Sequence, residues 1–245
     1  YGNSQDFQNK IPKIFKAQTK RYGILLGIQV LIKTINHNKY MKKLLFTLYF
    51  SCVCGVLLAI PTTEGTEFWA TFLKNHLNED ASPSLRLTLI ISSRENATVT
   101  VLNPQTGWSQ SVYVSANQIK ELEVPHVQAY TNNVGRIEKR GLKITSTSPI
   151  SLYASNYDDA SYDASIVLPT TALGLDYILQ IYENELAAKE FAIVATTNNT
   201  TITITPHART TDGHIKNIPD SITSNAGETY QVMSEDEGCD FSGSR

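Results

Sequence analysis

Much of the chain alternates between apolar and polar positions, a pattern that predicts β-strands. The alternation is clearest in residues 85–91, 98–102 and 200–205, where Leu, Val or Ile recurs at about every second position. Because successive side chains of a strand point to opposite faces, this period indicates half-buried strands. Turn residues fill positions 92–96, so the first two strands are predicted to form a hairpin.

Further short strands follow, separated by Pro and Gly. They are predicted at residues 111–114, 119–124, 142–145 and 150–154. No long stretch has the 3.6-residue period of a helix. Turn signals recur roughly every 8–12 residues, which is typical of a β-sandwich. The predicted fold class is therefore all-β, with sandwich-like units.

Two segments recur in the same order, which indicates an internal duplication. Residues 96–104 resemble 199–206 at an offset of 103, and residues 115–122 resemble 225–232 at an offset of 110. A duplicated β unit of about 105 residues explains both matches. Chance similarity between Thr-rich strands is the alternative. We predict tandem repeats with the same strand order.

The equivalence of residues 98–102 and 201–205 predicts which of their side chains face inward. Val99 and Val101 in the first copy, and Ile202 and Ile204 in the second, should face inward. The first copy continues into the strand at 150–154, whereas the sequence stops before the equivalent strand of the second. We therefore expect the second copy to be truncated and the chain to be a fragment of a longer protein.

The N-terminal part of the chain differs from the rest in its basic residues and in a continuous apolar run. Met41-Lys42-Lys43 is followed by an apolar run of 17 residues, 44–60, which is shorter than the ~20 that cross a bilayer. A short basic segment before such a run is typical of a secretory signal peptide. We predict cleavage near residues 60–64, with an uncleaved membrane anchor as the alternative.

These observations divide the chain into four parts. Residues 1–40 precede the first plausible start, Met41, and are interpreted as an upstream, non-native leader. Residues 41–61 form the signal peptide, 62–172 the first β unit and 173–245 the second, incomplete one. The mature protein is expected to be secreted or held at the cell surface, with no membrane span of its own.

The charge and cysteine content disfavour some classes of partner and of fold. Residues 1–61 carry nine Lys/Arg and one acid, so the remainder has 12 basic and 22 acidic residues, a formal net charge of −10. An acidic body disfavours a nucleic-acid partner, because binding phosphates requires a basic surface. Cys239 is the only cysteine after residue 61, which excludes an internal disulfide scaffold in the mature chain.

Motifs for catalysis are missing from the sequence. It contains no G-x-S-x-G elbow, no H-E-x-x-H and no glycine-rich phosphate loop. We predict that the protein is not an enzyme and uses no cofactor or metal. A secreted glycosidase stays open as an alternative, and two buried acids facing each other in a cleft would indicate it.

The densest cluster of candidate binding residues is 156–163. Asp158 and Asp159 could contribute to a Ca²⁺ site, but the segment lacks the order of an EF-hand loop. The simpler interpretation is a solvated loop between two strands. Tyr157 and Tyr162 could instead contact a partner, as aromatic residues at interfaces often do.

Trp108 is a further candidate, because it follows Gly107 in a predicted hairpin loop. An exposed tryptophan can stack on a sugar ring, whereas a buried one would cover the edge of the core.

Four motifs, in this order and spacing, resemble the N-terminal domain of the IgGFc-binding protein family. They are Gly65-Thr66-Glu67-Phe68-Trp69; Ile144-Thr145-Ser146 with Pro149-Ile150-Ser151-Leu152-Tyr153; Asp163 with Leu168-Pro169 and Leu173-Gly174-Leu175-Asp176-Tyr177; and Ala226-Gly227-Glu228-Thr229-Tyr230. The resemblance covers about residues 64–245. The family also includes bacterial secreted and surface proteins, and the lysine-rich signal peptide is similar to bacterial ones.

The resemblance implies an extracellular, non-catalytic binding or adhesion module with a protein or glycoprotein partner. It does not imply that this chain binds an antibody Fc. The alternative is a structural β-repeat that spaces another domain from the cell envelope.

Overall fold

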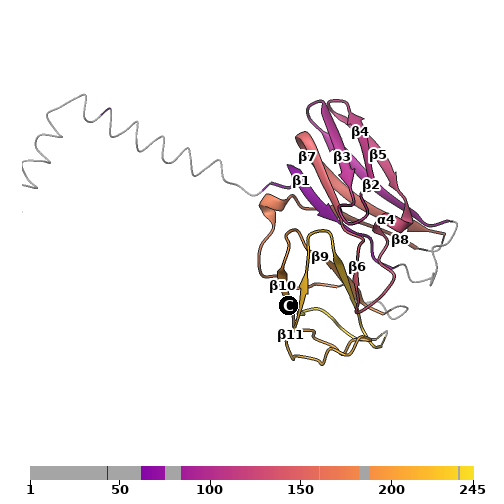
Figure 1. Ribbon diagram of the computed structural model, residues 1–245, viewed down its shortest axis with the longest axis vertical. Helices are drawn as coiled ribbons and strands as arrows, with labels where there is room; N and C mark the ends of the chain where they lie inside the picture. The colour runs from indigo at the N-terminus through magenta and orange to yellow at the C-terminus, as the bar shows by residue number, and fades with distance from the viewer. Residues whose placement is uncertain (1–42, 44–61, 75–83, 160, 182–187, 237) are drawn as a thin grey trace, which may run out of the picture. The chain divides into compact units, whose positions relative to one another are not determined.

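The computed structural model describes residue 43 and residues 62–74, 84–159, 161–181, 188–236 and 238–245 (Figure 1). The described residues from 62 onward belong to one compact unit, Pro61–Arg245. The predicted leader (1–40) and signal peptide (41–61) lie outside the described residues, apart from Lys43. Within the described ranges, no helix is both long and apolar enough to span a membrane.

The all-β prediction is confirmed, because strands form nearly all of the regular structure described after residue 61. The helical elements there are short: α4 (His126–Ala129) and the 3₁₀ turn η1 (Thr170–Ala172). The strands are β1 (Gly65–Ala70), β2 (Arg86–Ser93), β3 (Ala97–Leu102), β4 (Ser109–Val114), β5 (Gln118–Val124), β6 (Ile137–Glu138), β7 (Leu142–Asp158), β8 (Ser161–Val167), β9 (Glu190–Val194), β10 (Thr200–Ile204), β11 (Asp220–Ser224) and β12 (Thr229–Met233).

The 17-residue strand β7 organises the first half of the unit. Its first part pairs with β1 and β3, and β4 lies beyond β3. Its second part pairs with β2 and β8, and β5 lies beyond β2. The change of partners falls near Pro149, which has no N–H to donate to a neighbouring strand. One strand therefore joins two groups of strands.

Both groups contribute side chains to one sandwich-like hydrophobic core. Val99 and Ile144 come from the first group, and Leu89 and Leu152 come from the second, all with 0% exposure. The polar positions between them lie mostly on the outer faces, as the alternating sequence predicts. Complete burial of such a side chain contributes roughly 1.5–3 kcal/mol.

The predicted hairpin between the first two strands is wrong. β2 and β3 are strands as expected, but they do not pair with each other; β2 pairs with β5 and β7, whereas β3 pairs with β4 and β7. The turn residues after Ser93 connect the two groups of strands. β2 and β3 are therefore neighbours in sequence but are separated in the sheet by β7. The predicted hairpin around Gly107, between β3 and β4, is confirmed.

Two smaller sheets form the second half, β10–β11 and β6–β12–β9. Their buried side chains, including Ile204, Val232 and Phe241, form a second hydrophobic cluster. The two halves meet at the turn around Gly227. Gly227 has a φ of 81° and accepts a hydrogen bond from Gly141 N at 3.0 Å. A Cβ atom at Gly227 would lie 2.6 Å from Pro104, so glycine is required by both backbone and space.

The predicted directions of the repeated strands agree with the structure. Val99 and Val101 are fully buried and Ile204 is 2% exposed, whereas Thr201 and Thr203 are exposed. Ile202 points to the second core but is only partly buried. These orientations follow from the strand period and do not by themselves establish a duplication.

Candidate binding surface

An exposed cluster of aromatic and apolar side chains lies on the hairpin of β7 and β8. We call it the tyrosine face and define it as Tyr153, Tyr157, Tyr162 and Ile166. Their exposed fractions are 44%, 40%, 61% and 41%. Tyr153 lies opposite Ile166, and Tyr157 lies opposite Tyr162, in the β7–β8 pairing. Directly opposed residues share a face of the sheet, so the four side chains form one surface.

Backbone pairing holds this surface in place. The rings of Tyr157 and Tyr162 meet edge to face, with centroids 6.2 Å apart. On its other edge, β7 pairs with β2, where Arg86 lies opposite Tyr157. Arg86 in turn lies 3.8 Å from the carboxylate of Glu123 on β5. Aromatic side chains on paired strands, next to exposed charges, resemble the arrangement of an interface with apolar anchors and a polar rim.

The structure separates the predicted residues of segment 156–163. The expected solvated loop is wrong, because Tyr157 and Asp158 pair with Tyr162 and Ser161 as strand residues. Asp158 is only 3% exposed. Its Oδ1 accepts hydrogen bonds from the Ser84 hydroxyl and the Asp159 backbone N–H.

The buried carboxylate of Asp158 therefore anchors the hairpin, while Asp159 is exposed. Among the residues that the structure describes, no three His, Cys, Asp or Glu side chains are arranged to hold a metal ion. Tyr157 and Tyr162 are the two predicted binding residues of this segment that share an accessible surface.

Trp108 lies elsewhere, at the turn of the β3–β4 hairpin. It is partly buried and packs against the first hydrophobic core. Gly107, at a φ of 79°, and Asn103, whose carbonyl oxygen accepts the Gly107 N–H at 2.9 Å, close this turn. Of its two expected roles, covering the edge of the core agrees with the position of Trp108.

Sequence reasoning missed Tyr153 and Ile166 as candidate binding residues. Tyr153 was part of a predicted strand, four positions before Tyr157, and residues at that spacing in a strand share a face. This period could have identified Tyr153. Ile166 could not be found in that way, because its place depends on the pairing of β8 with β7.

A buried polar network occupies the second half. His214 Nε2 lies 3.2 Å from Asp212 Oδ2 and 3.1 Å from the hydroxyl of Tyr230. That hydroxyl donates to Asp212 Oδ2 at 2.7 Å. Asp220 Oδ2 lies 3.1 Å from His214 Nδ1. Burial and Asp212 together raise the pKa of Tyr230, so its hydroxyl keeps its proton.

This network joins the loop before β11 to strand β12. The tyrosine proton is already directed at Asp212, and both His214 and Tyr230 are less than 10% exposed. A hydrogen-bonded core network of this kind rigidifies a fold. It offers no accessible nucleophile for hydrolytic chemistry.

Glu190, at the start of β9, is another ionisable group with a shifted pKa. Burial raises its pKa to about 7, although a hydrogen bond from Gln231 opposes the shift. Gln231 Nε2 donates to Glu190 Oε2 at 2.5 Å. The positive charge of Lys74 lowers the pKa and the negative charge of Asp163 raises it, with smaller effects. Glu190 therefore changes charge near neutral pH.

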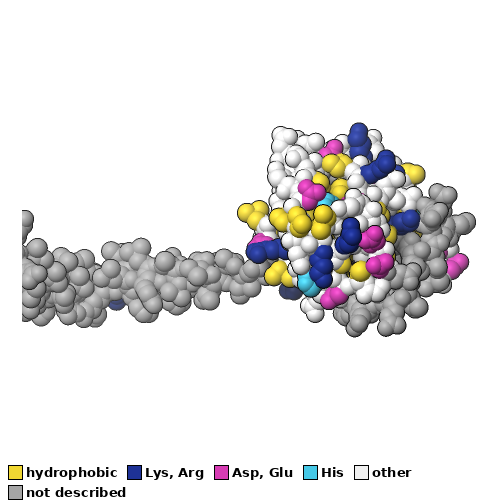
Figure 2. Space-filling model, turned by 90° about the horizontal axis from the view of Figure 1, so that it is seen from below, with side chains coloured by type: hydrophobic (Ala, Val, Ile, Leu, Met, Phe, Trp, Pro, Cys, Tyr) yellow, Lys and Arg dark blue, Asp and Glu magenta, His cyan; other side chains and the backbone are white. Residues whose placement is uncertain are grey.

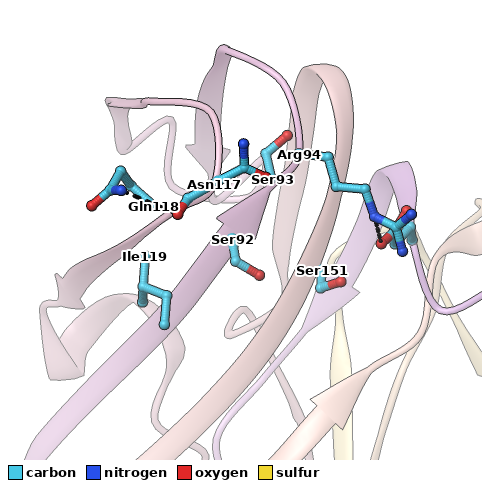
Figure 3. Close-up of a pocket in the computed structure, with 8 residues that line it drawn as sticks. Ser92, Ser93, Arg94, Asn117, Gln118, Ile119 and Ser151 are labelled. Atoms are coloured by element: carbon cyan, nitrogen blue, oxygen red, sulfur yellow. Dashed lines mark hydrogen bonds and ion pairs between the residues drawn. The ribbon is translucent and has the colours of Figure 1, made fainter.

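A shallow depression of about 290 Å³ lies where β2 ends and β5 begins (Figure 3). Ser92, Gln118 and Ile119 contribute to its lining, and the side chains shown in Figure 3 are spread over an open surface. The ionisable side chains in its lining, Arg94 and Glu64, pair with each other at 3.1 Å. This arrangement provides no convergent set of groups for catalysis.

Figure 2 shows a second surface of the molecule, seen from below the view of Figure 1. Acidic, basic and hydrophobic side chains are interspersed on it, without a patch of one sign. Nucleic-acid binding usually requires clustered Lys and Arg. This face therefore carries no electrostatic indication of such a partner.

Comparison with known proteins identifies one relationship. Residues 163–245 match the family model described as IgGFc binding protein, so the resemblance noted from the sequence motifs is confirmed over that part of the chain. No curated protein and no solved structure matches the chain. The description of the matched family is that of a binding protein, which indicates a binding module.

Proposed function

We propose, from the family match of residues 163–245 and the tyrosine face, that the protein is a secreted or cell-surface adhesion module without catalytic activity. Its partner would be a protein or glycoprotein. The single observation that carries the proposal is the exposure of Tyr153, Tyr157 and Tyr162 on paired strands.

The tyrosine side chains of this surface favour binding energetically. Tyrosine side chains bury a large area and lose little conformational freedom when they bind, and they dominate many interfaces. Here the strand pairing of β7 with β2 and β8 already fixes their backbone. A pre-organised surface loses less entropy on association than a flexible loop does.

Tyr157 and Tyr162 are the proposed contact residues, as the sequence suggested, and Tyr153 and Ile166 join them. Asp159 lies exposed next to the hairpin and could contribute a polar contact. Asp158 would act indirectly, by holding the turn. Trp108 would keep its position against the core.

We further propose that residues 41–61 direct export and that the mature protein starts near residues 60–64. Residues 1–40 would be an upstream, non-native leader, 62–172 the first β unit and 173–245 the second, incomplete one. The acidic charge of the mature part and the interspersed charges in Figure 2 agree with a partner other than nucleic acid. A structural spacer is the competing function, but it would not require exposed tyrosines on rigid strands.

The proposal can be tested by surface plasmon resonance with two immobilised probes, IgG Fc and a mucin, each in glycosylated and enzymatically deglycosylated form. A double variant, Tyr157→Ser with Tyr162→Ser, should weaken binding by at least about tenfold, as expected when interface anchors are removed. Tyr113→Ser is the matched control, because Tyr113 is 58% exposed on β4, outside the tyrosine face.

Loss of binding in the double variant alone would support the tyrosine face as the binding surface. Equal weakening by Tyr113→Ser would contradict it. If the folded wild-type protein binds none of the probes, the adhesion proposal fails for these ligand classes and the spacer function is favoured.

A further inference from the structure

The strands of the second half repeat the pairings of the first half residue by residue. β9 corresponds to β2 at an offset of 102, β10 to β3 at 103, and β11 and β12 to β4 and β5 at 110. The corresponding pairs include Leu89–Leu122 with Phe191–Val232, and Thr100–Ser111 with Thr203–Ser221. A slip of one residue would change every pair and turn each side chain to the other face of the sheet. Identical registers therefore indicate the same arrangement of strands in both halves.

Side-chain contacts repeat as well. The hydroxyls of Thr100 and Ser111 lie 2.9 Å apart, and so do those of Thr203 and Ser221. In the first half, the turn before β5 is fixed by the side chain of Asn96, which accepts from Ala116 N at 2.9 Å. In the second half, the side chain of Asn198 accepts from Ala226 N at 3.1 Å.

The correspondence extends to the last residue of the chain. In the first half, Lys143 at the start of β7 lies opposite Leu102 at the end of β3. In the second half, Arg245 exchanges two backbone hydrogen bonds with Thr205, of 2.6 and 3.0 Å. Thr205 is the equivalent of Leu102. Arg245 therefore occupies the position of Lys143, and Figure 1 shows the C-terminus beside β10 and β11.

An ion pair occurs at the same place in both halves. Lys143 Nζ lies 2.8 Å from Glu67 of β1. Arg245 Nε donates to Asp176 Oδ1 at 2.6 Å. Leu179, three residues after Asp176, bonds through its N–H to Ser244 O at 2.9 Å. Residues 176–179 thus correspond to the part of β1 that flanks β7.

In the described part of the second half, no strand takes the position that β7 fills in the first half. Among the described residues, β10 pairs with β11 alone and β9 is an outer strand of its sheet. Val99, Leu89 and Ile91 are 0% exposed, whereas their equivalents Ile202, Phe191 and Ile193 are only partly buried. Phe68 of β1 is 0% exposed, and its equivalent Tyr177 is 54% exposed.

We propose that β10, residues 176–179 and β9 form an acceptor site for one further β-strand with alternating apolar side chains, in the register that Arg245 sets. The strand would run antiparallel to β10, as β7 does to β3. Its inward positions would be apolar, in the alternation that Ile144, Ile150 and Leu152 show in β7. Unpaired strand edges bind extended segments through main-chain hydrogen bonds, and alternate side chains give specificity.

The experiment supplies such a strand in a form whose register is known. The sequence of residues 144–157 is appended after Arg245 of the full chain, so that the added Ile lies beside Ile204. Hydrogen exchange of the β10 amides is compared with that of the unmodified chain. We expect at least about tenfold slower exchange in β10 and a higher thermal midpoint, because burial and ladder hydrogen bonds are added.

The matched control carries one additional Ser between Arg245 and the same extension. This shift turns the apolar side chains to the opposite face and should leave exchange in β10 unchanged. Equal protection by both extensions, or protection by neither, would overturn the proposal. Protection that occurs only in a dimer, detected by sedimentation, would also overturn it, because the strand would then come from a second copy. These outcomes do not involve the tyrosine face, so they are independent of the proposed function.

Discussion

At the residue scale, position along a strand decides what a substitution costs. Ile204 is 2% exposed and Thr203, its neighbour in β10, is exposed. Replacing a buried Ile by Ala alone costs roughly 2–5 kcal/mol, and a charge in its place adds the penalty of desolvation. We expect Ile204→Asp to lower the free energy of unfolding by at least about 3 kcal/mol. Thr203→Asp should change it by about 0.5 kcal/mol or less.

Urea unfolding of the two variants measures the difference directly. Both carry the same new charge, and they differ only in the face to which it points. Similar losses of stability would show that β10 does not bury one face.

Glu190 should give the protein a pH-dependent stability. Its pKa is raised from 4.5 to about 7 in the folded state. Between these values the folded state binds more protons than the unfolded state, so stability falls as pH rises. Above pH 7 the ionised Glu190 carboxylate lowers the free energy of unfolding by up to about 3 kcal/mol, the value that corresponds to a pKa shift of this size.

Glu190→Gln removes this charge and retains a group that can pair with Gln231. We expect the variant to be more stable than the wild type at pH 8 and nearly unchanged at pH 5. Glu123→Gln is the control, because the Glu123 side chain is 61% exposed. If the Glu190 and Glu123 variants show the same pH dependence in urea unfolding, the assignment to Glu190 is wrong.

At the scale of elements, one buried side chain holds the β3–β4 hairpin against its neighbours. Asn103 is 0% exposed, and its Nδ2 donates to the carbonyl oxygens of Gln128 and Lys139 at 2.7 and 3.0 Å. Its Oδ1 accepts the backbone N–H groups of Gln105 and Thr106. Asn103 therefore connects the hairpin turn to the segments around α4 and β6.

Asn103→Ala should cost about 3 kcal/mol, because it leaves several backbone groups unpaired in the interior. Asn96→Ala removes an exposed side-chain hydrogen bond to Ala116 N and should cost about 1 kcal/mol or less. Thermal unfolding of both variants provides the comparison. A loss at Asn103 no larger than that at Asn96 would contradict the structural role.

Local sequence predicted which segments are strands but not which strands pair. The period of β2 and β3 correctly identified their buried residues, because alternation depends only on the chain itself. Their pairing with β7 is a long-range property, and turn residues at 92–96 suggested a hairpin instead. The length of β7 was also missed, since Ser146 to Pro149 has the composition of a loop. Asp158 was placed in a loop for the same reason, whereas Ile166 was overlooked because its position depends on the pairing of β8 with β7.

At the scale of the whole molecule, the proposed export can be tested without a known ligand. Residues 41–70 are fused to a reporter enzyme that is active only outside the cytoplasm. We expect reporter activity, because a basic segment followed by an apolar run is typical of a secretory signal peptide. A fusion with Leu48→Arg serves as the control, because a charge in the apolar run should block export. Equal activity of the two fusions, or none with the wild-type segment, would contradict the localisation.

The shared strand β7 has a consequence for the order of folding. β7 follows β1–β5 in the chain, yet β1, β2 and β3 all pair with it. During synthesis, these strands emerge before the segment that joins them. The β3–β4 hairpin can form early, whereas the β1 pairing must wait for a contact between distant parts of the chain, which slows folding. In pulse-labelled refolding, amides of β3 and β4 should be protected before those of β1. A secreted chain with this topology would reach the exterior with its sheet edges unpaired until β7 follows.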